Sequence, residues 1–368
     1  LGPIESDGDD SCLRQLEAEG VVLRTRLDGR EAWCERRLLA RIHRYTVERL
    51  RSEIRPVTAA QFLDYLACWQ HVDDEHRLEG PRGLTDVVRQ LAGFELPSVA
   101  WESRVLPARV RGYRREWLDR LTLRGELAWG RLWGQGAAPI RTTPLCLLPR
   151  EDLDAWLCLA GPARPPRLSA PATQILELLQ ARGASFPQEL KRDTKLLANQ
   201  LELGLGELIS RGLVTCDSFS GLRGLTVPPS RRRWPLGTAG RWCLFRQPDG
   251  EEHHEGQVEF VAERLLRRYG VLFRRLLARE RQPIPWRELA RRLRRGELQG
   301  RVRGGRFVAG FDGEQYALPE AVQLLRRVRR RGRNGILKVS AADPLNLRGI
   351  LTPDERVSPL VQQEVEVG

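Results

Sequence analysis

The sequence has almost no lysine and no methionine. Only three of its 368 residues are lysines, so arginine supplies nearly all of the 61 basic side chains. With 48 acidic side chains the net charge is +13, which favours a polyanionic partner such as nucleic acid or an anionic membrane surface. Such an arginine bias also arises in GC-rich genomes. Because a chain of this size normally contains several methionines, we expect a fragment of a longer protein, or a chain whose modified methionines are not shown.

Several other sequence signals are absent. No apolar run approaches about eighteen residues, and the acidic start, LGPIESDGDD, does not resemble a signal peptide, so we expect a cytoplasmic protein with no membrane partner. The seven cysteines include no C-x-x-C pair, which predicts reduced, buried thiols. The motifs G-x-x-x-x-G-K-S/T, G-x-S-x-G and H-E-x-x-H are missing, which excludes a recognisable phosphate-loop ATPase site in this sequence. We therefore predict no cofactor.

The segment HVDDEH, His71–His76, combines two histidines with three acidic residues. It misses the zinc-binding pattern H-x-x-E-H by one residue. Because loops between helices commonly have this polar composition, we favour a solvated loop and predict no metal site.

A repeated unit runs through the chain, in which a helix ends at a glycine and is followed by residues that favour strands. In three copies a leucine lies four residues before the glycine, on the buried face of the last turn, and the glycine supplies the left-handed conformation that ends the helix. These pairs are Leu16–Gly20, Leu121–Gly125 and Leu208–Gly212. In a fourth copy we expect the helix to end at Gly296, with Leu293 replacing the leucine because Arg292 occupies its position.

A helix pair followed by a two-stranded wing is the organisation of a winged helix, a variant of the helix-turn-helix. We therefore predict an α+β fold of tandem winged-helix modules with a small β-barrel. The alternative is that each copy is only an amphipathic helix with a glycine cap. Four copies, each followed by a hairpin, favour the winged helix.

The predicted boundaries follow these repeats. Residues 1–56 form the end of a winged-helix module and a connecting helix, and further winged-helix modules occupy 57–161, 162–230 and 258–334. Residues 231–257 form a linker and a barrel strand, and residues 335–368 form barrel strands and a tail. We expect the barrel to pair the last segment with strands near Cys146 and within 240–247.

Clusters of basic side chains are the candidate DNA-binding residues. Near Trp101, Tyr113 and Trp117, arginines alternate with aromatic rings, a combination that binds phosphates and stacks on bases. A second cluster lies in QLLRRVRRRGRNG, and a third around the candidate recognition helix of the 162–230 module. For the two arginine-rich clusters, the alternative is a solvated basic face. The predicted DNA-binding residues are Arg109, Arg111, Arg114, Arg115, Lys191, Lys195, Asn199, Arg326, Arg327, Arg329 and Arg330.

Asp343 is the candidate catalytic residue. It lies in SAADPLN, before a proline and close to Asn346, a setting typical of a tight turn. A turn-initiating aspartate is the favoured interpretation. The alternative is a carboxylate that activates water or stabilises a sugar cation during base excision.

Six longer segments resemble one protein family. They are AWCERRLLARIHRYTVERLR, FLDYLACWQHV, LAGFELPSVAWESRVLPARV, RYGVLFRRLLARE, GGRFVAGFDGEQYALPEA and VSAADPLNLRGIL. They closely resemble the C-terminal domain of the bacterial large helicase-related (Lhr) family of superfamily 2 DNA helicases.

The resemblance implies a DNA-repair helicase whose ATPase core lies N-terminal to this chain. It implies tandem winged helices with a β-barrel, and homo-oligomers, notably tetramers. It also implies partial similarity to DNA glycosylases that unhook interstrand crosslinks, with uracil excision as another activity.

We therefore expect the DNA-binding and homo-oligomerising C-terminal domain of a DNA-repair helicase. Its expected partners are single-stranded or damaged DNA, the helicase core and other copies of itself. Two alternatives stay open: a DNA glycosylase in which Asp343 assists attack on a flipped nucleotide, and a purely structural oligomerisation hub. A glycosylase requires a pocket beside its carboxylate.

Overall fold

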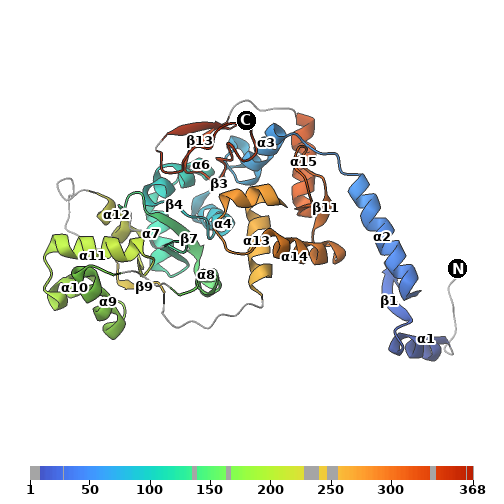
Figure 1. Ribbon diagram of the computed structural model, residues 1–368, viewed down its shortest axis with the longest axis horizontal. Coiled ribbons are helices and arrows are strands. Elements are labelled where there is room, and N and C mark those ends of the chain that lie inside the picture. The colour runs from blue at the N-terminus through green and yellow to red at the C-terminus, as the bar shows by residue number, and fades with distance from the viewer. Residues whose placement is uncertain are drawn as a thin grey trace.

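The computed structural model describes most of the chain, namely residues 9–27, 29–134, 139–162, 167–227, 240–246, 256–331, 337–361 and 363–367. Most of residues 231–257, predicted as a linker and a barrel strand, fall outside these segments. Helices and short strands are mixed along the chain, as the α+β prediction requires. Helices α9–α11 lie at one end of the molecule, and α1, β1 and α2 lie at the other (Figure 1).

The first described elements are a helix, a hairpin and a long helix. They are α1 (Asp9–Ala18), β1 (Val22–Leu27), β2 (Arg30–Glu35) and α2 (Arg36–Ser52). The Glu35 carboxylate begins α2 by accepting hydrogen bonds from the backbone N–H groups of Arg37 and Leu38, at 2.8 and 2.7 Å. All residues of α2 are described and none is buried, and the helix extends away from the rest of the molecule (Figure 1).

The next module is a winged helix with a three-stranded sheet. Its elements are α4 (Gly80–Leu91), β4 (Leu96–Pro97), α5 (Ser98–Ala100), η2 (Trp101–Val105), α6 (Leu106–Arg109), α7 (Arg115–Leu123), β6 (Leu127–Gly130) and β7 (Pro144–Pro149). The sheet order is β4-β7-β6, so the last strand lies between the other two. A short parallel pair, β3 (Leu78–Glu79) and β5 (Val110–Arg111), lies within the same stretch, and α8 (Leu153–Ala160) follows it.

The second module has the same strand order. Its elements are α9 (Ala170–Arg182), α10 (Pro187–Thr194), α11 (Ala198–Ser210), β8 (Val214–Cys216), α12 (Phe219–Thr226) and β9 (Trp242–Leu244). β9 pairs with β8, and its first residue also bridges to Ser185, which takes the place of the first strand. Ser169 caps the start of α9, since its hydroxyl accepts a hydrogen bond from Ala172 N.

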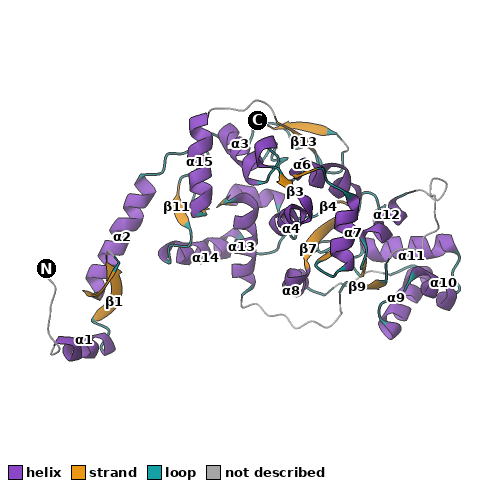
Figure 2. Ribbon diagram, turned by 180° about the vertical axis from the view of Figure 1, so that it is seen from behind, coloured by secondary structure: helices purple, strands orange, loops and turns teal. Residues whose placement is uncertain are grey.

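The third module repeats this topology once more. Its elements are α13 (Gln257–Tyr269), β10 (Val271–Phe273), η5 (Arg274–Arg279), α14 (Trp286–Leu298), β11 (Arg303–Gly305) and β12 (Gln315–Ala317). The sheet order is β10-β12-β11. Helix α15 (Pro319–Arg331) follows and packs against α3 (Ala59–Trp69), as both ribbon views show (Figures 1 and 2). Residues 57–69 therefore pack with the third module, although they precede the first in sequence.

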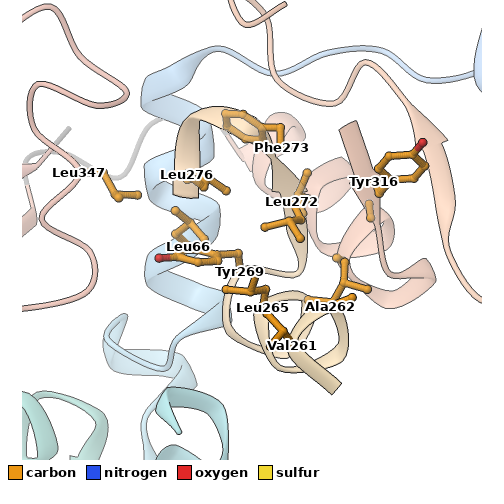
Figure 3. Packing of buried hydrophobic residues seen from close by; sticks show 14 of the residues in the cluster. Leu66, Val261, Ala262, Leu265, Tyr269, Leu272, Phe273, Leu276, Tyr316 and Leu347 are labelled. Carbon is orange, nitrogen blue, oxygen red and sulfur yellow. The ribbon is translucent and has the colours of Figure 1, made fainter. Parts of the chain in front are cut away.

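Two apolar clusters hold the body of the molecule together. One spans the first two modules, and the Trp129 and Trp242 rings meet edge to face within it, with centroids 6.1 Å apart. The other joins α3, the third module and the segment around Leu347, with Tyr269 and Phe273 near its centre (Figure 3). Each cluster contains residues that are far apart in sequence, so the modules share hydrophobic cores and do not fold as independent units along the chain.

Left-handed glycines end four helices with one hydrogen-bond pattern. Gly20, Gly125 and Gly212 have φ of +74°, +71° and +70°. In each case the following residue donates to the carbonyl of the leucine four residues before the glycine, at 2.9 to 3.0 Å.

The fourth copy shows that the predicted helix end at Gly296 is wrong. Helix α14 continues to Leu298, Gly300 has φ +73°, and Arg301 N donates to Gly296 O at 2.8 Å. Gly296 therefore occupies the position of the leucine, and a Cβ there would lie 3.3 Å from Cγ2 of Val302. Leu293 is buried, as predicted.

The strands expected in a barrel belong to three separate sheets. Pro144–Pro149 pairs within the first module, and Trp242–Leu244 pairs within the second. β13 (Leu337–Ser340) pairs only with β14 (Glu364–Val367) among the described residues. The expected pairing is therefore wrong, and no closed barrel is found among the described strands.

Candidate nucleic-acid interface

The third helix of each winged-helix module is the element that this motif presents to DNA. In this structure those helices are α7, α11 and α14, each followed by the strands of its hairpin. Their exposed side chains differ strongly in charge, which separates the three modules.

Helix α14 has a continuous basic stripe. Arg287, Arg291 and Arg295 are exposed and lie four residues apart, so they share one face of the helix. Within the described part of the chain, none of the three forms an ion pair, whereas Arg294 pairs with Glu314 at 2.8 Å and Arg292 pairs with Glu259. The stripe was missed in the sequence analysis, although the spacing in WRELARRLRRGEL could have indicated it.

The wing of the same module is also basic. Arg306 is exposed and Arg303 is half-buried, both between α14 and β12. Guanidinium groups bind phosphate in a bidentate manner. Helix and wing together therefore present a surface suited to a phosphate backbone.

The predicted residues of the second module lie around α11. Lys191, Lys195 and Asn199 are exposed, and Lys195 has a left-handed backbone conformation, with φ +56°, between α10 and α11. The surface here is mixed, because Leu197 and Leu203 are 64% and 72% exposed. This module is the least basic of the three at its third helix.

The predicted arginines of the first module separate into two groups. Arg114 and Arg115 are exposed at the start of α7. Arg111 is exposed but donates to Asp74 O at 3.0 Å and lies 3.5 Å from a Glu79 oxygen. Arg109 is fully buried.

The α15 cluster lies beside the end of α2. Arg326, Arg327 and Arg330 are exposed, and Arg329 is half-buried and donates to Arg55 O at 3.4 Å. Arg326, Arg329 and Arg330 line one cavity of about 200 Å³, and Arg327 lines another of about 220 Å³.

Asp343 and Arg109, predicted separately, bind one another in the interior. Nη1 and Nη2 of Arg109 lie 2.7 and 2.8 Å from the two Asp343 carboxylate oxygens, and the side chains are 0% and 2% exposed. Arg109 also donates to Gln70 Oε1 at 3.2 Å, and Asp343 Oδ1 accepts from Leu345 N at 2.9 Å. This two-pronged pairing gives Asp343 a structural partner, and the burial of Arg109 argues against its contact with DNA.

A large cavity has neither member of this pair in its lining. It has a volume of about 770 Å³ and is lined by residues of η5, the hairpin of the third module and 350–353. Phe311, Arg274 and Asp312 lie in its wall, and Phe311 packs against Phe273 with ring centroids 5.1 Å apart. With Arg275 also in the lining, it offers one aromatic ring, two guanidinium groups and one carboxylate.

Burial shifts the pKa of three groups around α3 and the first module. It raises the pKa of the Cys68 thiol to about 11 and lowers the pKa of His71. It also raises the pKa of Glu95 to about 7, although that carboxylate accepts hydrogen bonds from Leu132 N and Trp133 N at 2.7 and 2.9 Å.

The segment predicted as a solvated loop, His71–His76, is partly a 3-10 helix, η1 (Asp74–His76). The side chains of Cys68, Asp73 and His76 lie close together here.

None of the described helices has the length and apolar character needed to cross a membrane.

Comparison with known proteins identifies two of the modules. Residues 57–150 and 251–336 each match a family described as "Large helicase-related protein, winged-helix domain". The chain is 30% identical to "Lhr helicase/ probable uracil glycosylase" of Mycolicibacterium smegmatis, across 84% of this chain and 22% of that protein. It is 28% identical to "Lhr helicase/uracil glycosylase" of Escherichia coli, across 93% of this chain and 25% of that protein. The chain thus spans a quarter or less of these curated relatives.

A solved structure with a related arrangement is the Streptomyces sahachiroi DNA glycosylase AlkZ. The TM-score is 0.45 at 16% identity, with 79% of this chain and 77% of that one covered. The two family matches and the extended similarity to both relatives confirm the resemblance seen in the sequence, and the chain belongs to the large helicase-related (Lhr) family.

Proposed function

We propose that this chain binds DNA through the third helices of its winged-helix modules, with α14 making the principal contact. The observation that carries the proposal is the exposed stripe of Arg287, Arg291 and Arg295. Three like charges on one helix face repel one another, and a phosphate backbone would relieve that repulsion. Arg303 and Arg306 would extend the contact along the wing.

The test is the salt dependence of DNA binding. A variant with Arg287→Gln, Arg291→Gln and Arg295→Gln is titrated against labelled single-stranded and duplex oligonucleotides by fluorescence anisotropy at several salt concentrations. If each arginine neutralises one phosphate, the slope of log affinity against log salt should become shallower by about two to three.

A matched control removes the same charge elsewhere. The variant Arg82→Gln, Arg89→Gln and Arg182→Gln changes exposed or half-exposed arginines on α4 and α9. Its slope should stay within about one of the parent slope, since only the long-range field changes. Equal losses in both variants would contradict a specific contact through α14.

A second candidate function is base excision, because both curated relatives carry uracil glycosylase in their names. The cavity of about 770 Å³ supports it, since Phe311 could stack on a flipped base and Asp312 could supply the carboxylate. Asp343, the residue proposed from the sequence, would first have to leave Arg109.

Incubation with uracil-containing single-stranded DNA, followed by alkali, tests this candidate. Cleavage that is lost in Asp312→Asn but kept in Asp343→Asn would locate the chemistry in the cavity, and the reverse result would return it to Asp343. The absence of cleavage by DNA-binding protein would leave a recognition domain.

Family membership supports further proposals about the partners. We propose that a helicase core in the same polypeptide handles ATP, that the protein acts in the cytoplasm, and that the chain self-associates, with the homo-tetramer as the specific expectation. Light scattering on this 42.0 kDa chain tests the last point. A monomer at all accessible concentrations would contradict self-association.

A further inference from the structure

A cluster of metal-ligating side chains lies at the end of α3. The ligand atoms of Cys68, Asp73 and His76 are all within 4.8 Å of one another. Cys68 is on the last turn of α3, and His76 ends η1. The chain returns sharply between them, with His71 at φ +62° and Asp73 N donating to Ala67 O at 3.1 Å. This turn brings Asp73 and His76 back beside the Cys68 thiol.

A cavity lies at the same place. It has a volume of about 220 Å³, and Cys68 and His76 both line it. Asp64 lines it as well, one turn before Cys68 on the same face of α3. The opposite wall comes from α15, where Leu324 and Val328 contribute apolar surface. The cluster therefore borders a cavity and is not enclosed on all sides by packed side chains.

The set of donors matches a particular class of ion. A thiolate, an imidazole and a carboxylate are the ligands of zinc, which takes four ligands in a tetrahedron and keeps one position open in many sites with three protein ligands. Magnesium and calcium prefer oxygen ligands alone. In the structure His76 Nδ1 lies 2.7 Å from Asp73 Oδ2, so two of the ligands already face one another.

The charges around the cavity are consistent with an ion carrying two positive charges. A thiolate and one carboxylate would neutralise it, and Asp64 would add a third negative charge. Arg327 and Arg331 line the far side. Arg331 pairs with Glu75 at 3.0 Å through both guanidinium nitrogens, so these two charges balance and Arg327 is left to offset the excess.

We propose that Cys68, Asp73 and His76 form a binding site for a zinc-class divalent ion, with Asp64 or a water molecule from the cavity as fourth ligand. On binding, the ion takes the place of the hydrogen bond between His76 and Asp73, so the ligating imidazole nitrogen gives up its proton to solvent and the neutral ring carries its proton on the other nitrogen. The Cys68 thiol gives its proton to solvent as the sulfur–metal bond forms, and no oxidation or reduction is involved. The ion would join the end of α3 to the segment that leads into the first module.

The experiment uses the whole chain after removal of metal with a chelator. Co²⁺ and Zn²⁺ are added separately and the bound metal is counted after desalting. We expect one equivalent of each ion, and for Co²⁺ a thiolate-to-metal charge-transfer band together with the visible absorption of a tetrahedral complex. Thermal unfolding should shift to higher temperature with Zn²⁺, because the ion binds the folded state.

Two variants and a control make the result specific. Cys68→Ser should lose the charge-transfer band, and His76→Gln should weaken binding at least tenfold. His76 is only partly buried, so its replacement keeps the test informative if Cys68→Ser fails to fold. The control Cys216→Ser replaces another buried thiol outside the cluster and should bind like the parent. Substoichiometric metal in the parent, or binding that both variants retain, would overturn the proposal.

Discussion

Arginine has different roles in the interior around Arg109 and on the surface of α14. Arg109 is fully buried, and both prongs of its guanidinium bind Asp343. The arginines of the α14 stripe are exposed and, in the described part of the chain, unpaired. Net charge alone does not distinguish the two groups. Only the arginines that carboxylates leave unpaired on the surface can recognise a polyanion, so the +13 excess indicates a partner without locating it.

The two regions should respond oppositely to substitution. A change in the interior should alter the free energy of unfolding, since a buried charge without its partner is costly. A change on α14 should alter binding and leave unfolding almost unchanged.

The largest effect is expected for Asp343→Ala, because it leaves the Arg109 guanidinium buried without its counter-charge. The free energy of unfolding should fall by about 3 to 5 kcal/mol. Urea unfolding followed by circular dichroism measures it. Glu126→Ala, which removes the carboxylate of an exposed pair with Arg124 at 3.8 Å, is the control and should cost less than about 1 kcal/mol. Similar losses in both variants would remove the distinction between the regions.

Glu95 is an intermediate case, since its carboxylate is buried while its partner Arg281 is exposed. Burial raises its pKa from 4.5 to about 7, so the folded protein holds this proton more tightly than the unfolded chain. The contribution of this proton to the free energy of unfolding is complete below about pH 4.5. It is lost as the pH rises through 7, a change of about 3 kcal/mol. Glu95→Gln should remove this part of the pH dependence. If the free energies of unfolding of the parent and the variant changed with pH in parallel, the prediction for Glu95 would be contradicted.

The α15 cluster should contribute less to DNA binding per residue than the α14 stripe. Arg329 already donates to Arg55 O, and the carboxylates of Glu53 and Glu75 line the neighbouring cavities. Replacing Arg326, Arg327, Arg329 and Arg330 with glutamine should weaken binding and make the salt slope shallower by about one to two. An unchanged slope would exclude this cluster from the interface.

The smallest effect is expected on the second module. Lys191→Gln, Lys195→Gln and Asn199→Ala together remove two charges from a surface that also exposes Leu197 and Leu203. The salt slope should change by about one or less. A loss as large as that of the α14 variant would mean that all three modules bind DNA alike.

The repeated helix ends could be predicted because a glycine cap depends on residues within one turn. Leu16, Leu121 and Leu208 each accept the expected hydrogen bond. The fourth cap was misplaced by four residues, since GRVRGG offers further glycines. Helix α14 continues through Gly296, which packs against Val302, and the left-handed residue is Gly300. Spacing predicts which glycines could end a helix, and tertiary contacts decide which one does.

Pairing between distant segments could not be predicted. Asp343 was predicted to lie in a turn, and its backbone does so: Asp343 N donates to Ser340 O at 2.8 Å, and Asn346 N donates to Asp343 O at 2.9 Å. Its partner Arg109 was predicted to bind DNA because it lies in a stretch where arginines alternate with aromatic residues. The α14 stripe, by contrast, was readable from spacing alone. Local periodicity predicts exposure well, but it cannot show which charges meet in the interior.

The pairing of Arg109 with Asp343 also bears on how the chain acquires its structure. The two residues are separated by 234 positions, so Arg109 leaves the ribosome long before its counter-charge exists. Until then its guanidinium must stay in water, and the end of α6 cannot reach its final packing. The interior of the first winged-helix module around Arg109 is therefore completed only after the segment around Asp343 has been synthesised.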